Sequence, residues 1–152
     1  MSKIIVAESA GFCFGVNRAI NILYKLIDEN KPACTLGPII HNMQMVNELR
    51  KKGVRTIDKI SEAKENETIV IRSHGVPQSI VDEINERHLD YIDATCPFVS
   101  KIHKIVSETD DDSIVIIAGD KNHPEVQGIM GHCKSKCYTF KNQEELQELF
   151  SI

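Results

Sequence analysis

The chain has 152 residues, of which 41% are hydrophobic and 26% charged, and its formal net charge is −4. These values are typical of a globular protein with one domain or two small ones. Because no apolar run approaches the ~18 residues of a membrane span, and because Lys and Arg form no basic stripe, we expect neither a membrane nor a nucleic acid as a partner. The amino terminus makes a poor signal peptide, which predicts a cytoplasmic protein.

Short apolar runs alternate with segments of helical spacing along the whole chain. The β-branched run KIIVA at 3–7 predicts a buried strand. Further strands are predicted at 33–36, 54–57, 67–73, 90–94, 112–119 and 136–140. Helices are predicted at 16–30, 41–53, 77–88, 97–108, 123–132 and 142–150. Strands that alternate with helices indicate an α/β fold built on parallel sheets.

The alternation divides into repeated small parallel-sheet α/β units. We place the boundary near 94–100, where DATCPFV closes one strand and opens a helix whose first turn accepts Pro97. This division gives a first unit at 1–95 and a second at 96–152. Because no strand follows the last predicted helix, we expect the second unit to be incomplete.

Three strand-to-helix turns each carry a histidine: His41 in GPIIHN, His74 in RSHGVP and His123 in NHPE. Ligands of open α/β sheets bind at the carboxyl ends of strands, where imidazoles and helix amino termini can hold an anion. The pattern therefore predicts a phosphate or diphosphate site, with three unrelated turns as the alternative. Glu125 lies where a carboxylate suits the helix dipole and where it could also relay protons. Three other histidines fall in predicted helices and are interpreted as structural: His88, His103 and His132.

The chain has an odd number of cysteines, five, which argues against a disulfide framework in a cytoplasmic protein. Cys13, in AGFCFGVNRAI, and Cys96 each follow a predicted strand and precede a helix, at the same sheet edge as the histidines. Helix amino termini favour thiolates, and thiolates hold iron–sulfur clusters. Plain burial is the alternative for each thiol. The other cysteines receive no site role: Cys34, Cys133 and Cys137.

Three further interpretations stay open. The C-x4-R spacing from Cys13 to Arg18 is one residue shorter than the C-x5-R loop of cysteine phosphatases. The segment GHCKSKC offers three zinc ligands against the usual four of a structural site: His132, Cys133 and Cys137. A non-catalytic module could also grip a diphosphate through the histidine turns alone.

Five motifs in order closely resemble those of the 4-hydroxy-3-methylbut-2-enyl diphosphate reductases, from about residue 3 to 140: AGFCFGVNRAI, LGPIIHN, RSHGVP, DATCPFV and NHPEVQGIMGH. The resemblance implies three α/β units in a cloverleaf around a [4Fe–4S] cluster. It implies that Cys13 and Cys96 are metal ligands and that Glu125 delivers protons. It also implies that three side chains hold the substrate diphosphate: His41, His74 and His123.

The reaction implied by the resemblance is the reductive removal of the hydroxyl of 4-hydroxy-3-methylbut-2-enyl diphosphate. Its products are isopentenyl and dimethylallyl diphosphate, in the non-mevalonate isoprenoid pathway, and a ferredoxin or flavodoxin usually supplies the electrons. The third unit of the family and its cluster cysteine do not occur in this sequence. We therefore expect the chain to be the amino-terminal part of such an enzyme and to be inactive alone.

Overall fold

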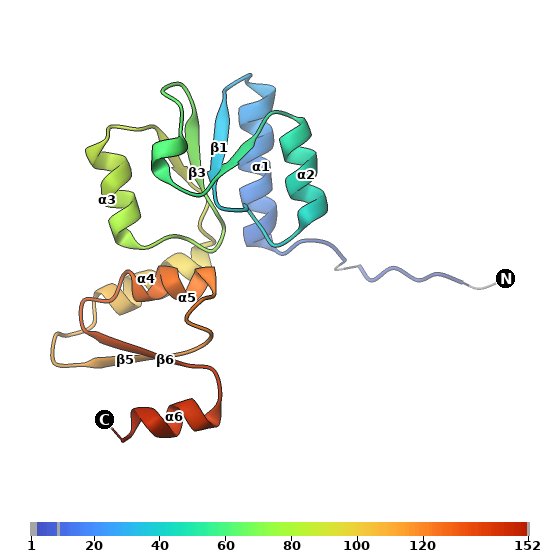
Figure 1. The fold of residues 1–152 in the computed structure, drawn as a ribbon. Helices are drawn as coiled ribbons and strands as arrows, with labels where there is room; N and C mark the ends of the chain where they lie inside the picture. Colours follow the sequence, from blue (N-terminus) through green and yellow to red (C-terminus); the bar gives the residue numbers. More distant parts are fainter. Residues whose placement is uncertain (1–2, 9, 152) are drawn as a thin grey trace.

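The computed structural model describes residues 3–8 and 10–151, in which the strands form two parallel sheets. The first sheet has the order β2-β1-β3-β4, and the second pairs β5 with β6 (Figure 1). The strands are β1 (Ala33–Leu36), β2 (Arg55–Ile57), β3 (Thr68–Ile71), β4 (Tyr91–Asp93), β5 (Ile114–Ala118) and β6 (Lys136–Phe140). The predicted α/β class with parallel sheets is confirmed.

The six predicted helices are all present, with ends shifted by a few residues. They are α1 (Phe14–Asp28), α2 (Met43–Lys51), α3 (Gln78–Glu86), α4 (Pro97–Ser107), α5 (Pro124–Met130) and α6 (Gln143–Leu149). The starts of α2 and α6 are fixed by asparagine caps, because the side chains of Asn42 and Asn142 accept hydrogen bonds from backbone N–H groups of the first turn. A short 3₁₀ helix, η1 (Ile60–Glu62), was not predicted.

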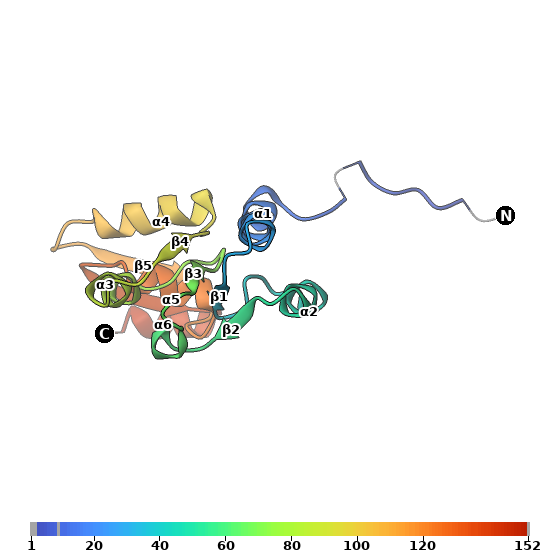
Figure 2. The ribbon, with the colours of Figure 1, turned by 90° about the horizontal axis from the view of Figure 1, so that it is seen from above.

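Helices cover both faces of the four-stranded sheet (Figure 2). On one face α1 and α2 pack against it through a core that includes Leu23, Leu49 and Val70. On the other face η1 and α3 contribute a second core, which includes Ile71 and Ile84. β1 (ACTL) is buried along its whole length and β3 (TIVI) after its first residue, as expected for central strands of a parallel sheet with helices on both faces. All four carboxyl ends of these parallel strands meet at one edge, where the histidine turns follow.

The predicted strand at 3–7 is wrong. This segment has no strand assignment, and Ile4 is 88% exposed. The β-branched run has the propensity for a strand, but a strand also needs a neighbour to pair with, and no described part of the chain lies beside it.

In chain order α4 lies between the strands of the first sheet and those of the second, and the last helix follows β6 without a further strand in the described residues. The unit boundary near 94–100 and the cloverleaf both stay predictions. Among the described segments, no helix is both long and apolar enough to cross a membrane.

We expect Leu23→Ala to lower the free energy of unfolding by about 2–5 kcal/mol, because Leu23 is fully buried between α1 and the sheet. The control Phe150→Ala removes an exposed ring and should change it by less than about 0.5 kcal/mol. Urea denaturation measures both variants. Equal losses would contradict the packing of α1.

Candidate functional site

The three predicted histidines lie together. The ring centroids of His41 and His74 are 4.5 Å apart, and His123 lies 5.6 Å from His41 and 5.8 Å from His74. They come from the turns after β1 and β3 and from the turn before α5. The structure thus brings one histidine from the second sheet's unit onto two from the first, which creates one imidazole cluster.

His74 is the most enclosed member of the cluster. Burial, followed by the neighbouring His41, Arg72 and His123, lowers its pKa from 6.5 to about 4. Its Nδ1 atom is buried and has no hydrogen-bond partner among the described residues. A buried polar atom that makes no hydrogen bond costs free energy. A hydrogen bond between His74 Nδ1 and a ligand would remove that cost.

The tautomer of His123 follows from its local hydrogen bond. The backbone N–H of Glu125 donates to His123 Nδ1 over 3.2 Å. Since this nitrogen accepts, a neutral His123 carries its proton on Nε2, which leaves Nε2–H as a donor. Glu125 itself lies half-buried in the first turn of α5.

One serine that the sequence analysis overlooked joins the turns. Ser73 is buried, and its hydroxyl donates to the carbonyl of Ile39 over 3.2 Å. Its own carbonyl accepts the backbone N–H of Cys96 over 2.9 Å. Ser73 therefore binds the turn of His41 on one side and the predicted metal ligand on the other, while His74 follows it directly.

Two of the three histidines interpreted as structural, His103 and His132, lie against the turn that carries His74. His103 and His132 stack with ring centroids 4.1 Å apart, and His132 Nε2 lies 3.1 Å from the carbonyl of Val76. Gly75 has φ +75° and lies so close that an added Cβ would come within 2.5 Å of His103 Cε1. This pair therefore positions the turn that carries His74.

Only His103 of the three histidines lies within a helix. His132 follows α5, and His88 follows α3 with φ 53°, so the predicted helix ends were too late by a few residues.

The two predicted thiol ligands lie at adjoining helix ends. Cys13 precedes α1 and Cys96 precedes α4, and neither thiol is used as a helix cap. Gly15, in the first turn of α1, packs so closely on Cys96 that an added Cβ would come within 2.5 Å of its sulfur. Only a residue without a side chain permits this approach, which brings the start of α1 against the start of α4 (Figure 2).

Arg18 is engaged in holding the same two helices. Its guanidinium donates to the carbonyls of Asp93 and Thr95, each over 3.1 Å. These bonds tie α1 to the segment that leads into Cys96. An arginine bound to backbone carbonyls is poorly placed to hold a phosphate ester, so the C-x4-R phosphatase interpretation loses its anion-binding residue.

The remaining cysteines lie apart from this site. Cys34 is buried in β1, and burial raises its pKa to about 11. Burial, followed by a hydrogen bond with Cys133, raises the pKa of Cys137 to about 12. Cys133 also donates to the carbonyl of Ile129 over 3.5 Å. The described residues contain no group of three His, Cys, Asp or Glu side chains placed to hold a metal ion, so the zinc interpretation of GHCKSKC has no ligand set.

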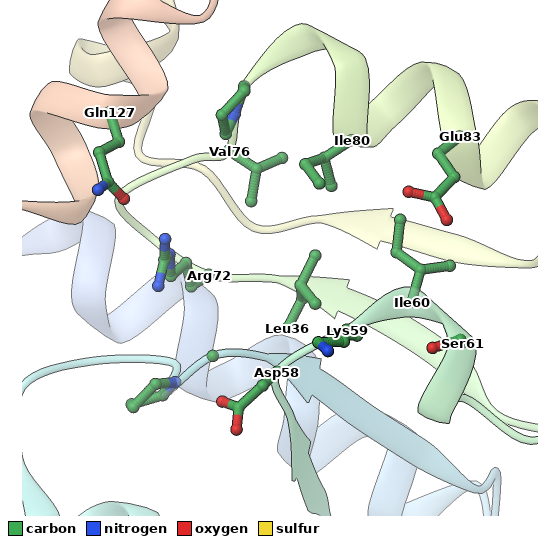
Figure 3. A pocket seen from close by; sticks show the side chains of 13 residues that line it. Leu36, Asp58, Lys59, Ile60, Ser61, Arg72, Val76, Ile80, Glu83 and Gln127 are labelled. Carbon is green, nitrogen blue, oxygen red and sulfur yellow. The ribbon is translucent and has the colours of Figure 1, made fainter.

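A cavity of about 510 Å³ lies beside the cluster, and its lining includes none of the predicted site residues. Figure 3 shows Arg72 and Gln127 at one end of it and Ser61 and Glu83 at the other. Burial lowers the pKa of Arg72, whose Nε donates to the carbonyl of Gly75 over 3.4 Å. Arg72 thus holds the same turn that packs against His103. The motif RSHGVP contained this residue, but its spacing alone did not mark it.

Comparison with known proteins agrees with this geometry. Residues 4–151 match the family described as LytB protein. The chain belongs to the LytB family. A curated 4-hydroxy-3-methylbut-2-enyl diphosphate reductase of Thermoanaerobacter sp. (strain X514) is 44% identical, and one of Alkaliphilus oremlandii is 39% identical. Each alignment covers 97% of this chain but 53% of the relative, so the chain spans about half the length of these LytB relatives.

Two solved LytB structures share the fold. One is (E)-4-hydroxy-3-methyl-but-2-enyl diphosphate reductase, the terminal enzyme of the non-mevalonate pathway, with a TM-score of 0.82 and 41% identity over 100% of this chain and 56% of that chain. The other is the E-1-hydroxy-2-methyl-but-2-enyl-4-diphosphate reductase from Plasmodium falciparum, with a TM-score of 0.83 and 28% identity over 93% of this chain and 45% of that chain.

The buried histidines predict a loss of stability in mild acid. Burial, then His132, lowers the pKa of His103 from 6.5 to about 4. Between these values the unfolded chain binds more protons than the folded chain, so stability falls as pH falls. His103→Leu should therefore reduce the drop in the urea midpoint between about pH 6.5 and about pH 4. An unchanged drop would contradict a neutral, buried His103.

Proposed function

We propose that this chain supplies the diphosphate-binding histidines, the proton donor and two cysteine ligands of a 4-hydroxy-3-methylbut-2-enyl diphosphate reductase. In the proposed reaction the substrate loses its hydroxyl as water while taking up two electrons and two protons, which gives isopentenyl or dimethylallyl diphosphate. The observation that carries the proposal is the cluster of His41, His74 and His123, with centroids 4.5 to 5.8 Å apart. The chain that carries this cluster belongs to the LytB family, and its curated relatives are named as this reductase.

The three imidazoles suit a diphosphate held without reaction. They can present ring N–H groups to one ligand from three separate turns. The low pKa of His74 keeps the unliganded cluster from accumulating positive charge. An anion stabilises imidazolium, so its arrival raises the affinity of the cluster for protons.

Glu125 is the proposed proton donor. It lies in the first turn of α5, two residues from His123, so the segment that holds the diphosphate also fixes the carboxyl group. Protonation of a leaving hydroxyl requires an acid within hydrogen-bond reach of the substrate, either directly or through one water. The short spacing to His123 keeps Glu125 near any ligand of the cluster.

Cys13 and Cys96 are the proposed ligands of a [4Fe–4S] cluster. The two thiols lie at adjoining helix ends and make no capping hydrogen bond, so both are available as part of a thiolate ligand set. When bound, such a cluster supplies electrons and a Lewis-acidic iron. The backbone N–H of Cys96 donates to the carbonyl of Ser73, and His74 follows Ser73 in the chain. This hydrogen bond keeps the backbone of Cys96 close to the backbone of His74.

The described residues contain no group of three side chains placed to hold a metal ion. The proposal therefore requires further cluster ligands from another polypeptide segment. The chain spans 53% of its relatives' length, which supports the proposal that it is inactive alone. A ferredoxin or flavodoxin is the proposed electron donor, and the cytoplasm is the proposed location. A non-catalytic diphosphate-binding module is the competing function, and it predicts the grip without the cluster.

We expect inorganic diphosphate to bind the isolated chain with uptake of protons near neutral pH. His41→Ala and His123→Ala should each weaken binding at least about tenfold, because each removes a charge-assisted hydrogen bond. His88→Ala, in the turn after α3, is the control and should bind normally. Calorimetry in buffers of different ionisation enthalpy measures both affinity and proton uptake. Equal affinities for all variants would contradict the proposed diphosphate-binding role of the histidine cluster.

Anaerobic reconstitution with iron and sulfide tests the ligands. Cys13→Ser and Cys96→Ser should each lower the bound iron, and Cys133→Ser should not, because its thiol is engaged with the carbonyl of Ile129. Iron analysis and Mössbauer spectroscopy measure the outcome. A stoichiometric four-iron cluster with turnover in this chain alone would contradict the requirement for further ligands, and unchanged iron in both ligand variants would support the non-catalytic module.

A further inference from the structure

Two cysteines outside the proposed site lie together at the end of α5. Cys133 follows the helix in the turn that leads to β6, and Cys137 is the second residue of that strand. The two thiols make a hydrogen bond with each other, and the thiol of Cys133 also donates to the carbonyl of Ile129 over 3.5 Å. Hydrogen-bonded thiols have their sulfur atoms in contact, which is the arrangement from which a disulfide can close.

The chain between the two cysteines can adjust while its far end stays in place. Cys137 is held in β6, opposite Val115 of β5, whereas Cys133 lies outside helix and strand. The hydroxyl of Ser135, between them, is buried without a hydrogen-bond partner among the described residues, so no bond of this side chain opposes a small movement. Closure therefore requires mainly that the Cys133 sulfur exchange its contact with Ile129 for a bond to Cys137.

A small oxidant can reach both thiols. Each is half-buried, whereas Cys34 is fully enclosed in β1. Lys134 and Lys136 are exposed and place positive charge beside the pair, which attracts an anionic disulfide. Burial, followed by the hydrogen bond with Cys133, raises the pKa of Cys137 to about 12, so this thiol stays protonated at neutral pH. Cys137 is therefore a poor first nucleophile.

We propose that Cys133 and Cys137 are a reversible thiol–disulfide pair that fastens the end of α5 to β6. The Cys133 sulfur attacks a low-molecular-weight disulfide such as oxidised glutathione, forms a mixed disulfide and expels one thiolate. The Cys137 sulfur then attacks the Cys133 sulfur and expels the second thiolate. The two protons lost by the protein go to these thiolates, so two protein thiols and one small disulfide become one protein disulfide and two small thiols. In a reducing compartment, disulfides are usually of this transient kind.

The pair lies next to contacts that hold the turn between β3 and α3. The carbonyl of Gly131 accepts the backbone N–H of Gln78 over 3.3 Å, and His132 Nε2 lies 3.1 Å from the carbonyl of Val76. Because Cys133 follows His132 directly, the disulfide restrains the segment that makes both contacts. The reaction needs neither a cluster nor a diphosphate, so its failure and the failure of the proposed function are distinguishable.

The test uses the double variant Cys13→Ser/Cys96→Ser, in which those two thiols cannot form a competing disulfide, with the unaltered chain treated in parallel. Each chain is equilibrated with reduced and oxidised glutathione, quenched with acid, alkylated and digested with trypsin. Trypsin cleaves after Lys134 and Lys136, so the disulfide joins two separate peptides, NHPEVQGIMGHCK and CYTFK. We expect mass spectrometry to detect the joined peptides and dithiothreitol to release them.

The folded double variant should form this disulfide at a glutathione ratio at least about tenfold more reducing than the urea-unfolded variant requires, because the fold holds the thiols together. Adding Cys133→Ser or Cys137→Ser gives the matched controls, which should yield no joined peptides. Hydrogen exchange at 131–133 should slow on oxidation. The absence of joined peptides in the folded chain, equal ratios for folded and unfolded chains, a mixed disulfide that does not close, or unchanged exchange would overturn the proposal.

Discussion

The site depends on the hydrogen bonds of one buried serine. Ser73 donates its hydroxyl to Ile39 and accepts the backbone N–H of Cys96, so three separate turns are held at fixed distances. The parallel pairing of β1 with β3 brings the first two turns to the same level, because Leu36 lies opposite Ile71 at the strand ends. An interior that is close-packed leaves this arrangement little freedom.

The segment that carries His123 is held beside these turns by packing rather than by strand pairing. His103 and His132 stack on each other against Gly75, and the carbonyl of Val76 lies within hydrogen-bonding distance of His132. These contacts fix where α5 begins relative to the turn of His74. The position of His123 in the cluster therefore depends on two histidines that touch no proposed ligand, and on a glycine that leaves room for them.

The sequence was informative wherever a local pattern determines structure. Helical spacing predicted the helices, and the strand-to-helix turns predicted which histidines meet at one edge. It was misleading at 3–7, because propensity does not reveal whether a neighbouring strand is present. It was silent on Ser73, Arg72 and the stack of His103 with His132, since such contacts join residues that are distant in the chain and leave no periodic signal.

The site has two ends of different character, joined by the peptide bond between Ser73 and His74. At the histidine end, the proposal requires a chain of net charge −4 to hold an anion through local donors, and an anion stabilises the protonated form of an imidazole. At the thiol end exposed apolar rings surround Cys13 and Cys96. The proposed substrate, with a diphosphate head and an allylic alcohol tail, matches this polarity. The proposed reductive chemistry requires that water be kept from the thiols, so the apolar rings around them suit that end of the site.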